Sequence, residues 1–186
     1  MNAHAAASDQ ADGIRRLLRA AAQPVSRARR AAGLVRARWL FRRCQLGERV
    51  FAGSKVVVRA DGNIALGDGV QFWMGTLPQE LVSERGASLV VGADTMFNYA
   101  VSVRASERVA IGARCMFGSH VCIGDSRGRP VAIGDDVWVA HGAIVEPGVR
   151  IGTGSVVSAG SVVTTDVPDR SLAVGNPARA VPLDVG

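Results

Sequence analysis

The chain has 186 residues, about the size of one domain, and 48% of them are hydrophobic, which is enough for a core. Its three Cys form no C-x-x-C pair, so we expect no disulfide framework and no zinc site, and we interpret Cys44, Cys115 and Cys122 as buried small residues in a reducing compartment. The net charge of +6 is uneven, because residues 1–50 hold 11 Arg against 3 acidic residues. The remainder has a net charge of −2, so the basic character belongs to the N-terminal segment.

This N-terminal segment is expected to be helical after a short tail. We interpret residues 1–11 as a disordered tail and residues 12–44 as a basic α-helical segment. Residues 12–22 show helical spacing of apolar residues, and Pro24 interrupts that pattern. A second helix is predicted over about residues 25–42, with one apolar stripe formed by Val25, Ala28, Ala32, Val35 and Trp39.

From Leu46 onward, apolar residues recur every six positions. The register is clearest at Ile133, Val139, Val145, Ile151, Val157 and Val163, and it recurs upstream at Val91, Phe97, Val103 and Val109 and at Ile111, Phe117 and Ile123. A period of six fits neither a helix nor an alternating strand, but it is typical of hexapeptide β-helix repeats. The sequence therefore predicts an all-β solenoid, and the strict register disfavours the alternative of a Gly-rich antiparallel sandwich. Three units make one triangular coil, and stacked coils share one core.

The stretch VWVAHGAIVEPGVRIGTGSVVSAGSVVTTDVPDRSLAVGNPARAV, residues 137–181, resembles the C-terminal signature of hexapeptide-repeat acyltransferases. It is similar in particular to galactoside, maltose and capsular or exopolysaccharide O-acetyltransferases. The resemblance implies a left-handed parallel β-helix as the acyltransferase domain, over residues 45–186. It also implies a homotrimer that binds acetyl-CoA and an acceptor in clefts between adjacent prisms.

Carried over residue by residue, the resemblance suggests which side chains bind the substrates. It places the pantetheine-binding wall at His141, Gly142, Ala159, Gly160 and Thr165, and a basic contact to the nucleotide phosphates at Arg179. Many relatives have Lys where this chain has Thr165. For the acceptor, the resemblance implies contacts from Asn98, in F-N-Y-A, and from Arg127.

An inserted loop is expected between two Ile-Gly pairs that begin at Ile123 and Ile133, ten residues apart where the usual spacing is six. In many relatives this loop supplies the His that deprotonates the acceptor. Here Asp125 matches the relatives, but Arg127 takes the place of the His, and a guanidinium cannot act as a base.

Two other histidines could act as the base. His120 and His141 are 21 residues apart, and without the four extra loop residues the separation is 17, almost one 18-residue coil. We therefore expect both side chains to point outward on stacked coils, within reach of the cleft at the loop. His120 is the predicted base, because imidazole titrates near neutral pH. Asp125 as a raised-pKa base, an amine acceptor that needs no base, and the absence of a true base are the alternatives.

We accordingly predict an acyl-CoA-dependent O- or N-acetyltransferase that acts on a sugar or lipid-linked glycan in polysaccharide or glycoconjugate biosynthesis. The alternative is a catalytically degenerate scaffold or partner subunit that lacks the loop His. No metal is expected, since a zinc carbonic anhydrase on such a scaffold needs three His, and His4 lies in the tail.

The basic helices are interpreted either as a cap on the open end of the solenoid or as a segment that binds an anionic membrane surface. For the second interpretation, the expected apolar side consists of Ile14, Leu17, Leu18, Val35, Trp39, Leu40 and Phe41. Nucleic acid is not an expected partner, because few aromatic residues lie between the arginines. No secretory signal and no membrane-spanning stretch is recognisable, so we expect the protein in the cytoplasm, and the second interpretation would place it peripherally at the inner membrane.

Overall fold

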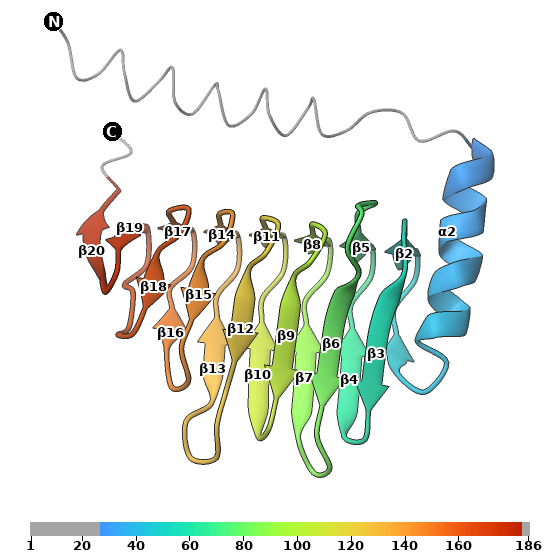
Figure 1. The fold of residues 1–186 in the computed structure, drawn as a ribbon, viewed down its shortest axis with the longest axis horizontal. Coiled ribbons are helices and arrows are strands. Elements are labelled where there is room, and N and C mark those ends of the chain that lie inside the picture. The colour runs from blue at the N-terminus through green and yellow to red at the C-terminus, as the bar shows by residue number, and fades with distance from the viewer. Residues whose placement is uncertain (1–26, 184–186) are drawn as a thin grey trace, which may run out of the picture.

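A computed structural model describes residues 27–183 of the chain. Within these residues, helix α2 (Arg27–Leu40) precedes a stack of short strands that forms a left-handed parallel β-helix (Figure 1). The solenoid predicted from the six-residue period is confirmed. The tail and the first helix that the sequence predicts, over residues 1–11 and 12–22, lie outside the described residues.

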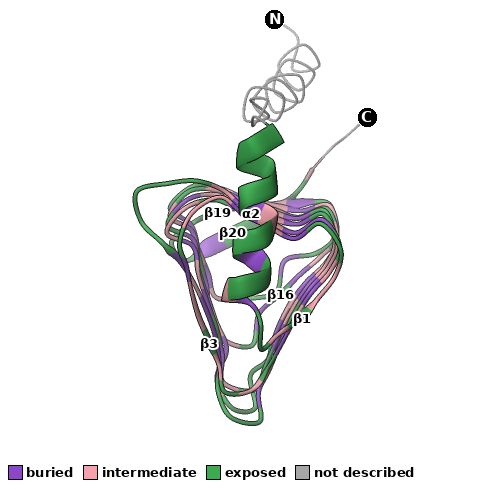
Figure 2. Ribbon diagram, turned by 90° about the vertical axis from the view of Figure 1, so that its right-hand side faces the viewer, coloured by how far each residue is buried: buried purple, intermediate pink, exposed green. Residues whose placement is uncertain are grey.

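The strands form three sheets, one for each side of a triangular prism (Figure 2). Sheet A contains β1 (Gln45–Leu46), β4 (Asn63–Leu66), β7 (Ser88–Val91), β10 (Arg108–Ile111), β13 (Val131–Ile133) and β16 (Arg150–Ile151). Sheet B contains β2 (Phe51–Ala52), β5 (Gln71–Phe72), β8 (Met96–Phe97), β11 (Met116–Phe117), β14 (Trp138–Val139), β17 (Val156–Val157), β19 (Ser171–Gly175) and β20 (Ala178–Pro182). Sheet C contains β3 (Val56–Ala60), β6 (Gln79–Ser83), β9 (Ser102–Ala105), β12 (Cys122–Gly124), β15 (Ile144–Val145) and β18 (Val162–Val163). Neighbouring strands are parallel, apart from the antiparallel hairpin of β19 and β20.

Inward side chains form columns that run along the prism. In sheet A, Ile133 pairs in register with Ile151, and both are buried. In sheet B, the Phe97 ring lies 5.1 Å from that of Phe72 and 5.0 Å from that of Phe117, and the rings are nearly parallel. Stacked phenylalanines therefore stabilise the N-terminal half of a core that is otherwise built mainly from small aliphatic side chains.

Helix α2 covers the N-terminal end of this column (Figure 1). Phe41, directly after the helix, is fully buried, and its ring stacks on Phe72 with a centroid distance of 5.2 Å. The register partner of Phe72 in β2 is the small Ala52, which leaves space for this ring. Gly33 lets the helix approach β2, because a Cβ there would lie 2.1 Å from the Phe51 ring. Helix α2 is thus a cap on the open end of the solenoid.

Polar contacts also hold the cap on the first coil. Arg36 Nη1 donates hydrogen bonds to the carbonyl oxygens of Ala52, at 3.1 Å, and Gly53, at 2.7 Å.

The expectation that Leu40 and Phe41 form part of an apolar side open to a membrane is wrong. Phe41 is fully buried in the core, and Leu40 packs against it.

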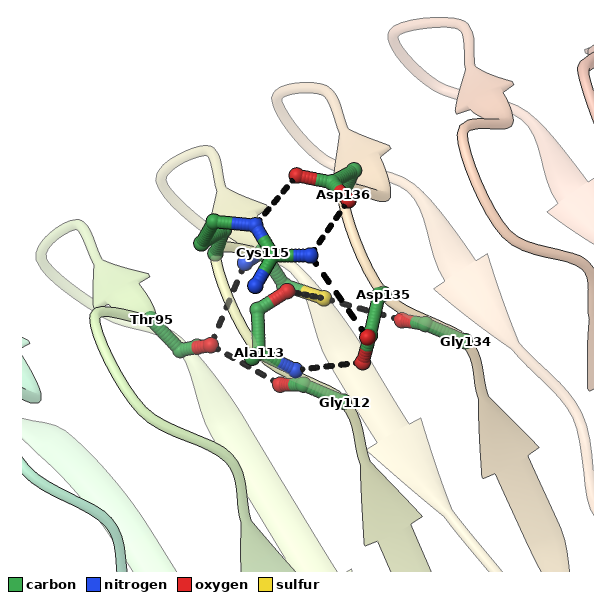
Figure 3. Close-up of polar contacts among 8 residues, drawn as sticks. Thr95, Gly112, Ala113, Cys115, Gly134, Asp135 and Asp136 are labelled. Carbon is green, nitrogen blue, oxygen red and sulfur yellow. Dashed lines mark hydrogen bonds and ion pairs between the residues drawn. The ribbon is translucent and has the colours of Figure 1, made fainter.

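The corner between sheets A and B turns through residues in the left-handed backbone region. Asp94, Arg114 and Asp136 have φ values of 54°, 55° and 56° on successive coils. The guanidinium of Arg114 donates two hydrogen bonds to the carboxylate of Asp136, at 2.8 and 2.7 Å (Figure 3). These hydrogen bonds lower the pKa of Asp136. Since both side chains are exposed, we expect the pair to hold adjacent turns together only weakly.

Beneath this corner, a buried thiol and a buried hydroxyl join three coils. Thr95 Oγ1 donates to the carbonyl oxygen of Gly112 at 2.9 Å and accepts from the backbone N–H of Cys115 at 3.1 Å (Figure 3). The thiol of Cys115 donates to the carbonyl oxygen of Gly134 at 3.1 Å. Burial raises the pKa of this thiol to about 11, so Cys115 stays protonated at neutral pH and is a structural residue.

The three cysteines differ in their exposure. Cys115 is buried and Cys44 is half-buried, whereas Cys122 is exposed. The sequence-based interpretation of all three as buried is therefore wrong for Cys122. In β12 the inward position belongs to Ile123, and Cys122 faces outward beside its register partner Ile144.

We predict that Phe41→Ala lowers the free energy of unfolding by about 3 kcal/mol, because it removes a buried ring from the end of the phenylalanine column. Urea unfolding followed by circular dichroism measures the change. Trp39→Ala, two residues away but 67% exposed, is the matched control and should change stability by less than about 0.5 kcal/mol. Equal losses for the two variants would show that α2 does not cap the core through Phe41.

Candidate active site

Three aromatic side chains line the corner where the chain passes from sheet B to sheet C. Tyr99, His120 and His141 follow β8, β11 and β14 on successive coils. The His120 ring lies edge-on between the other two, with centroid distances of 5.6 Å to Tyr99 and 5.4 Å to His141. Both histidines are exposed, so the prediction that they stack and point outward is confirmed.

A buried hydroxyl fixes the orientation of one of these imidazoles. Ser119 Oγ lies 2.7 Å from His141 Nδ1, and Ser119 is only 8% exposed. Since the hydroxyl can donate or accept, this contact fits either tautomer of His141; it engages Nδ1 and, among the described residues, leaves Nε2 as the ring nitrogen available to a substrate. Ser119 was not among the residues predicted from the sequence. Its position, 22 residues before His141, equals one 18-residue coil plus the four extra residues of the loop, and this spacing could have revealed it.

The backbone of His120 is left-handed, with φ of 61°. Ala100 and Gly142 hold the same conformation at the equivalent turns of the neighbouring coils, with φ of 57° and 66°. For residues other than Gly, this conformation costs about 1–2 kcal/mol, with Asn and Asp tolerating it best. The turn therefore accepts His120 at some cost to stability.

The same corner continues as a surface with little side-chain cover. A Cβ placed on Gly142 or on Gly160 would meet nothing within 4 Å, and Ala159, directly before Gly160 on the same coil, is exposed. The Gly160 N–H donates to the carbonyl oxygen of His141 at 2.8 Å, which joins the two turns. A flexible chain could lie along this strip of backbone next to the His141 imidazole.

The other predicted binding residues lie at different distances from this corner. Asn98 lies on it, and its Oδ1 accepts from the Tyr99 N–H at 2.9 Å. Thr165 is exposed after β18, beyond sheet C, and Arg179 is exposed in the C-terminal hairpin strand β20. The structure therefore brings Asn98 to the histidines but leaves Thr165 and Arg179 on neighbouring parts of the prism.

The inserted loop is a tight hairpin at the other edge of sheet C, between β12 and β13. Ser126 and Arg129 pair across it, and the Arg129 N–H donates to the Ser126 carbonyl at 2.8 Å. Arg127 is exposed at the tip, next to Gly128, whose φ is 73°. The Gly128 N–H donates to Glu107 Oε2 at 2.5 Å, which ties the tip to the preceding coil.

Asp125 holds the base of this hairpin. Its carboxylate accepts from the backbone N–H groups of Ser106, at 2.5 Å, Glu107, at 2.8 Å, and Arg108. The residue is 8% exposed, and both of its oxygens are engaged. These contacts give Asp125 a structural role between two coils, which disfavours it as the alternative base that the sequence allowed.

A shallow hollow of about 420 Å³ lies on sheet C below the hairpin. Outward side chains of Arg104, Cys122, Ile144 and Glu146 line it, and Asp125 closes one side. Among the described residues, neither His120 nor His141 lines this hollow, so it includes the base of the hairpin and not the histidine corner. Within residues 27–183, no group of three His, Cys, Asp or Glu is placed to hold a metal ion.

Comparison with known proteins identifies the repeats. A family model described as bacterial transferase hexapeptide (six repeats) matches residues 130–165, and a hexapeptide repeat of succinyl-transferase matches residues 108–147. A Schizosaccharomyces pombe protein with an acetyltransferase name is 56% identical over 54 residues, which is 29% of this chain and 26% of that protein. A Staphylococcus aureus protein that also has an acetyltransferase name is 52% identical over 58 residues, which is 31% of this chain and 29% of that protein. The chain thus spans little more than a quarter of the length of these relatives.

Solved structures share the fold over more of the chain. Perosamine N-acetyltransferase from Caulobacter crescentus, in complex with CoA and GDP-perosamine, is 27% identical with a TM-score of 0.52, covering 74% of this chain and 57% of its own. A hexapeptide-repeat acetyltransferase from Vibrio cholerae, complexed with acetyl-CoA, is 25% identical with a TM-score of 0.50, and the match covers 89% of this chain and 82% of that protein. A Clostridium difficile maltose O-acetyltransferase is 23% identical with a TM-score of 0.52, and the match covers 95% of this chain and 87% of that protein. At this identity the similarity supports the fold alone.

We predict that Asp125→Asn destabilises the protein by about 1–3 kcal/mol, because one amide oxygen cannot accept all three N–H groups. Thermal unfolding measures the loss. Asp61→Asn is a control at an exposed acidic residue and should leave the melting temperature unchanged. Unchanged stability in Asp125→Asn together with lost turnover would instead place this carboxylate in the chemistry.

Proposed function

The chain is a hexapeptide-repeat protein similar to acetyltransferases, and from this premise we propose that it transfers an acetyl group from acetyl-CoA to a hydroxyl or amine of a sugar or glycan. The observation that carries the proposal is the outward pair of His120 and His141, stacked beside a corner of bare backbone. The biological setting that fits such an acceptor is polysaccharide or glycoconjugate biosynthesis.

His120 is the proposed general base. Its imidazole takes the proton of the acceptor hydroxyl as the oxygen attacks the thioester carbon, and it returns that proton to the sulfur when the carbon–sulfur bond breaks. A general base must be unprotonated to accept this proton. Exposure on the corner leaves His120 accessible to an acceptor.

His141 is proposed to bind the pantetheine arm of the donor. If Ser119 donates its hydroxyl proton to Nδ1, the proton of the ring lies on Nε2, which can then donate to a carbonyl oxygen of the arm. Gly142, Ala159 and Gly160 offer close backbone contact along the same strip, and the proposal extends to Thr165 and to Arg179 for the phosphates. Acetyl-CoA here is a substrate that supplies the activated acyl group.

The acceptor is proposed to lie against Asn98 and the exposed guanidinium of Arg127. Asn98 shares the corner with His120, whereas Arg127 lies at the far edge of sheet C. A cleft that includes both needs a surface from a second copy, which supports a homotrimer.

We predict that light scattering at micromolar concentration gives a mass near three times the 19.4 kDa of one chain. The physical reason is that one prism presents the histidine corner and the hairpin on separate edges. A stable monomer that is fully active would contradict the shared cleft.

We further predict that His120→Asn lowers kcat about a hundredfold or more, with little change in KM for acetyl-CoA. Asn suits the left-handed backbone of position 120 but cannot take a proton near neutral pH. His141→Ala should mainly raise KM for acetyl-CoA. The assay follows CoA release with a panel of sugar hydroxyl and amine acceptors.

Arg49→Asn provides the matched control, because Arg49 has the same backbone conformation, with φ of 56°, far from the histidines in the first coil. It should keep full activity. Full activity in His120→Asn would exclude His120 as the base. No turnover by the unaltered protein with any acceptor would favour the degenerate scaffold, for which the Arg in place of the loop His is the supporting observation.

A further inference from the structure

Helix α2 has a second apolar side that the solenoid does not use. Val35 and Trp39 are 69% and 67% exposed, one helical turn apart. At 100° per residue they lie on the side of the helix opposite Gly33 and Ala37, which are buried against the first coil. The exposed residues Ala28, Ala31 and Ala32 extend the same side. We name these five exposed residues the outer stripe.

Arginines border the outer stripe along its length. Residues 27–43 contain seven Arg and no acidic residue. By helical geometry, Arg27 and Arg38 flank the stripe on one side, and Arg42 lies just past the end of the helix. Arg36, on the other side, donates its hydrogen bonds to the first coil and is not part of this border. The Arg42 guanidinium lies 5.6 Å from the Trp39 ring centroid, so cation and indole share one surface. The stripe is therefore an apolar strip inside a strongly basic border.

The stripe lies at an end of the molecule that a flat surface can reach. Helix α2 lies across the end of the prism, with its exposed side turned away from the strands (Figure 2). In the described part of the chain, no other element covers that side. A planar partner could contact the whole length of α2 without meeting the rest of the solenoid.

From this arrangement we propose that the outer stripe of α2 docks on an anionic lipid bilayer. Val35 and Trp39 enter the boundary between headgroups and acyl chains, where indole rings are favoured, and the bordering guanidinium groups bind lipid phosphates and carboxylates. A second copy of the chain is a poorer occupant, because facing stripes would bring their arginines together. Nucleic acid would satisfy the charge but leave Val35 without an apolar partner.

The docking proposal does not depend on the acetyl-transfer proposal. If both hold, the end cap would bring the histidine corner to acceptors that are carried on lipids, and this consequence alone rests on the proposed function. Within residues 27–183, no helix combines the length and apolar character needed to cross a bilayer.

The test is co-sedimentation of the full chain with vesicles of pure phosphatidylcholine and with vesicles that contain 30% phosphatidylserine. We expect salt-sensitive binding to the anionic vesicles only. The double variant Val35→Ala with Trp39→Ala should lower the partition coefficient about tenfold or more. Its control is Val174→Ala with Val181→Ala, a pair of exposed apolar residues, each 46% exposed, at the opposite end of the prism, and this variant should bind normally.

Charge is tested in the same assay by Arg38→Gln with Arg42→Gln, compared with Arg150→Gln and Arg170→Gln at the far end. Each arginine near the membrane surface should raise the vesicle partition coefficient about fivefold. Substitution of Arg38 and Arg42 should therefore weaken binding strongly, whereas substitution of the far pair should not. No binding to anionic vesicles at low salt, or unchanged binding by the Val35 and Trp39 variant, would overturn the proposal. Loss of self-association in that variant without any vesicle binding would identify a second copy as the occupant and would equally overturn it.

Discussion

Each coil of this solenoid can bury its inward side chains only against the coils on either side of it. This constraint favours an apolar residue at the same inward position of every coil, because each column of inward side chains packs only on the coils before and after it. It also leaves the two end coils with one uncovered side. Phe41 meets that need at the N-terminal end by adding one more ring to the column of Phe72 and Phe97.

The same stacking determines what the outer surface can do. Turns of successive coils lie directly above one another, so residues about 20 positions apart in the sequence form continuous outer columns. At one corner that column contains His120 and His141, followed by Gly142 and Gly160. Reactive imidazoles therefore lie beside bare backbone without any folding of distant segments onto each other, and a rigid scaffold holds them in place.

Sequence periodicity was sufficient for the coils from Val91 onward and for the stacking of the histidines, since both follow from counting residues. It was weaker before residue 90, where the register partners Leu46, Leu66 and Val91 are more than 18 residues apart. It was insufficient for the direction of α2, because that helix has two apolar sides, and a pattern cannot tell which one meets the core. The role of Asp125 depends on N–H groups from the preceding coil, 17 to 19 residues earlier in the chain, at a spacing disturbed by the inserted loop. The outward direction of Cys122 was missed because composition alone was used to place it.

The account's central claim is that the corner bearing His120 and His141 receives the thiol end of the acyl donor. A crystal structure of the protein with CoA bound tests this claim most directly. The account predicts the CoA sulfur within hydrogen-bond reach, about 3.5 Å, of one of the two imidazoles, with the pantetheine arm along Gly142 and Gly160. CoA bound on sheet A, or along the hairpin at Arg127 with its sulfur remote from both histidines, would contradict it.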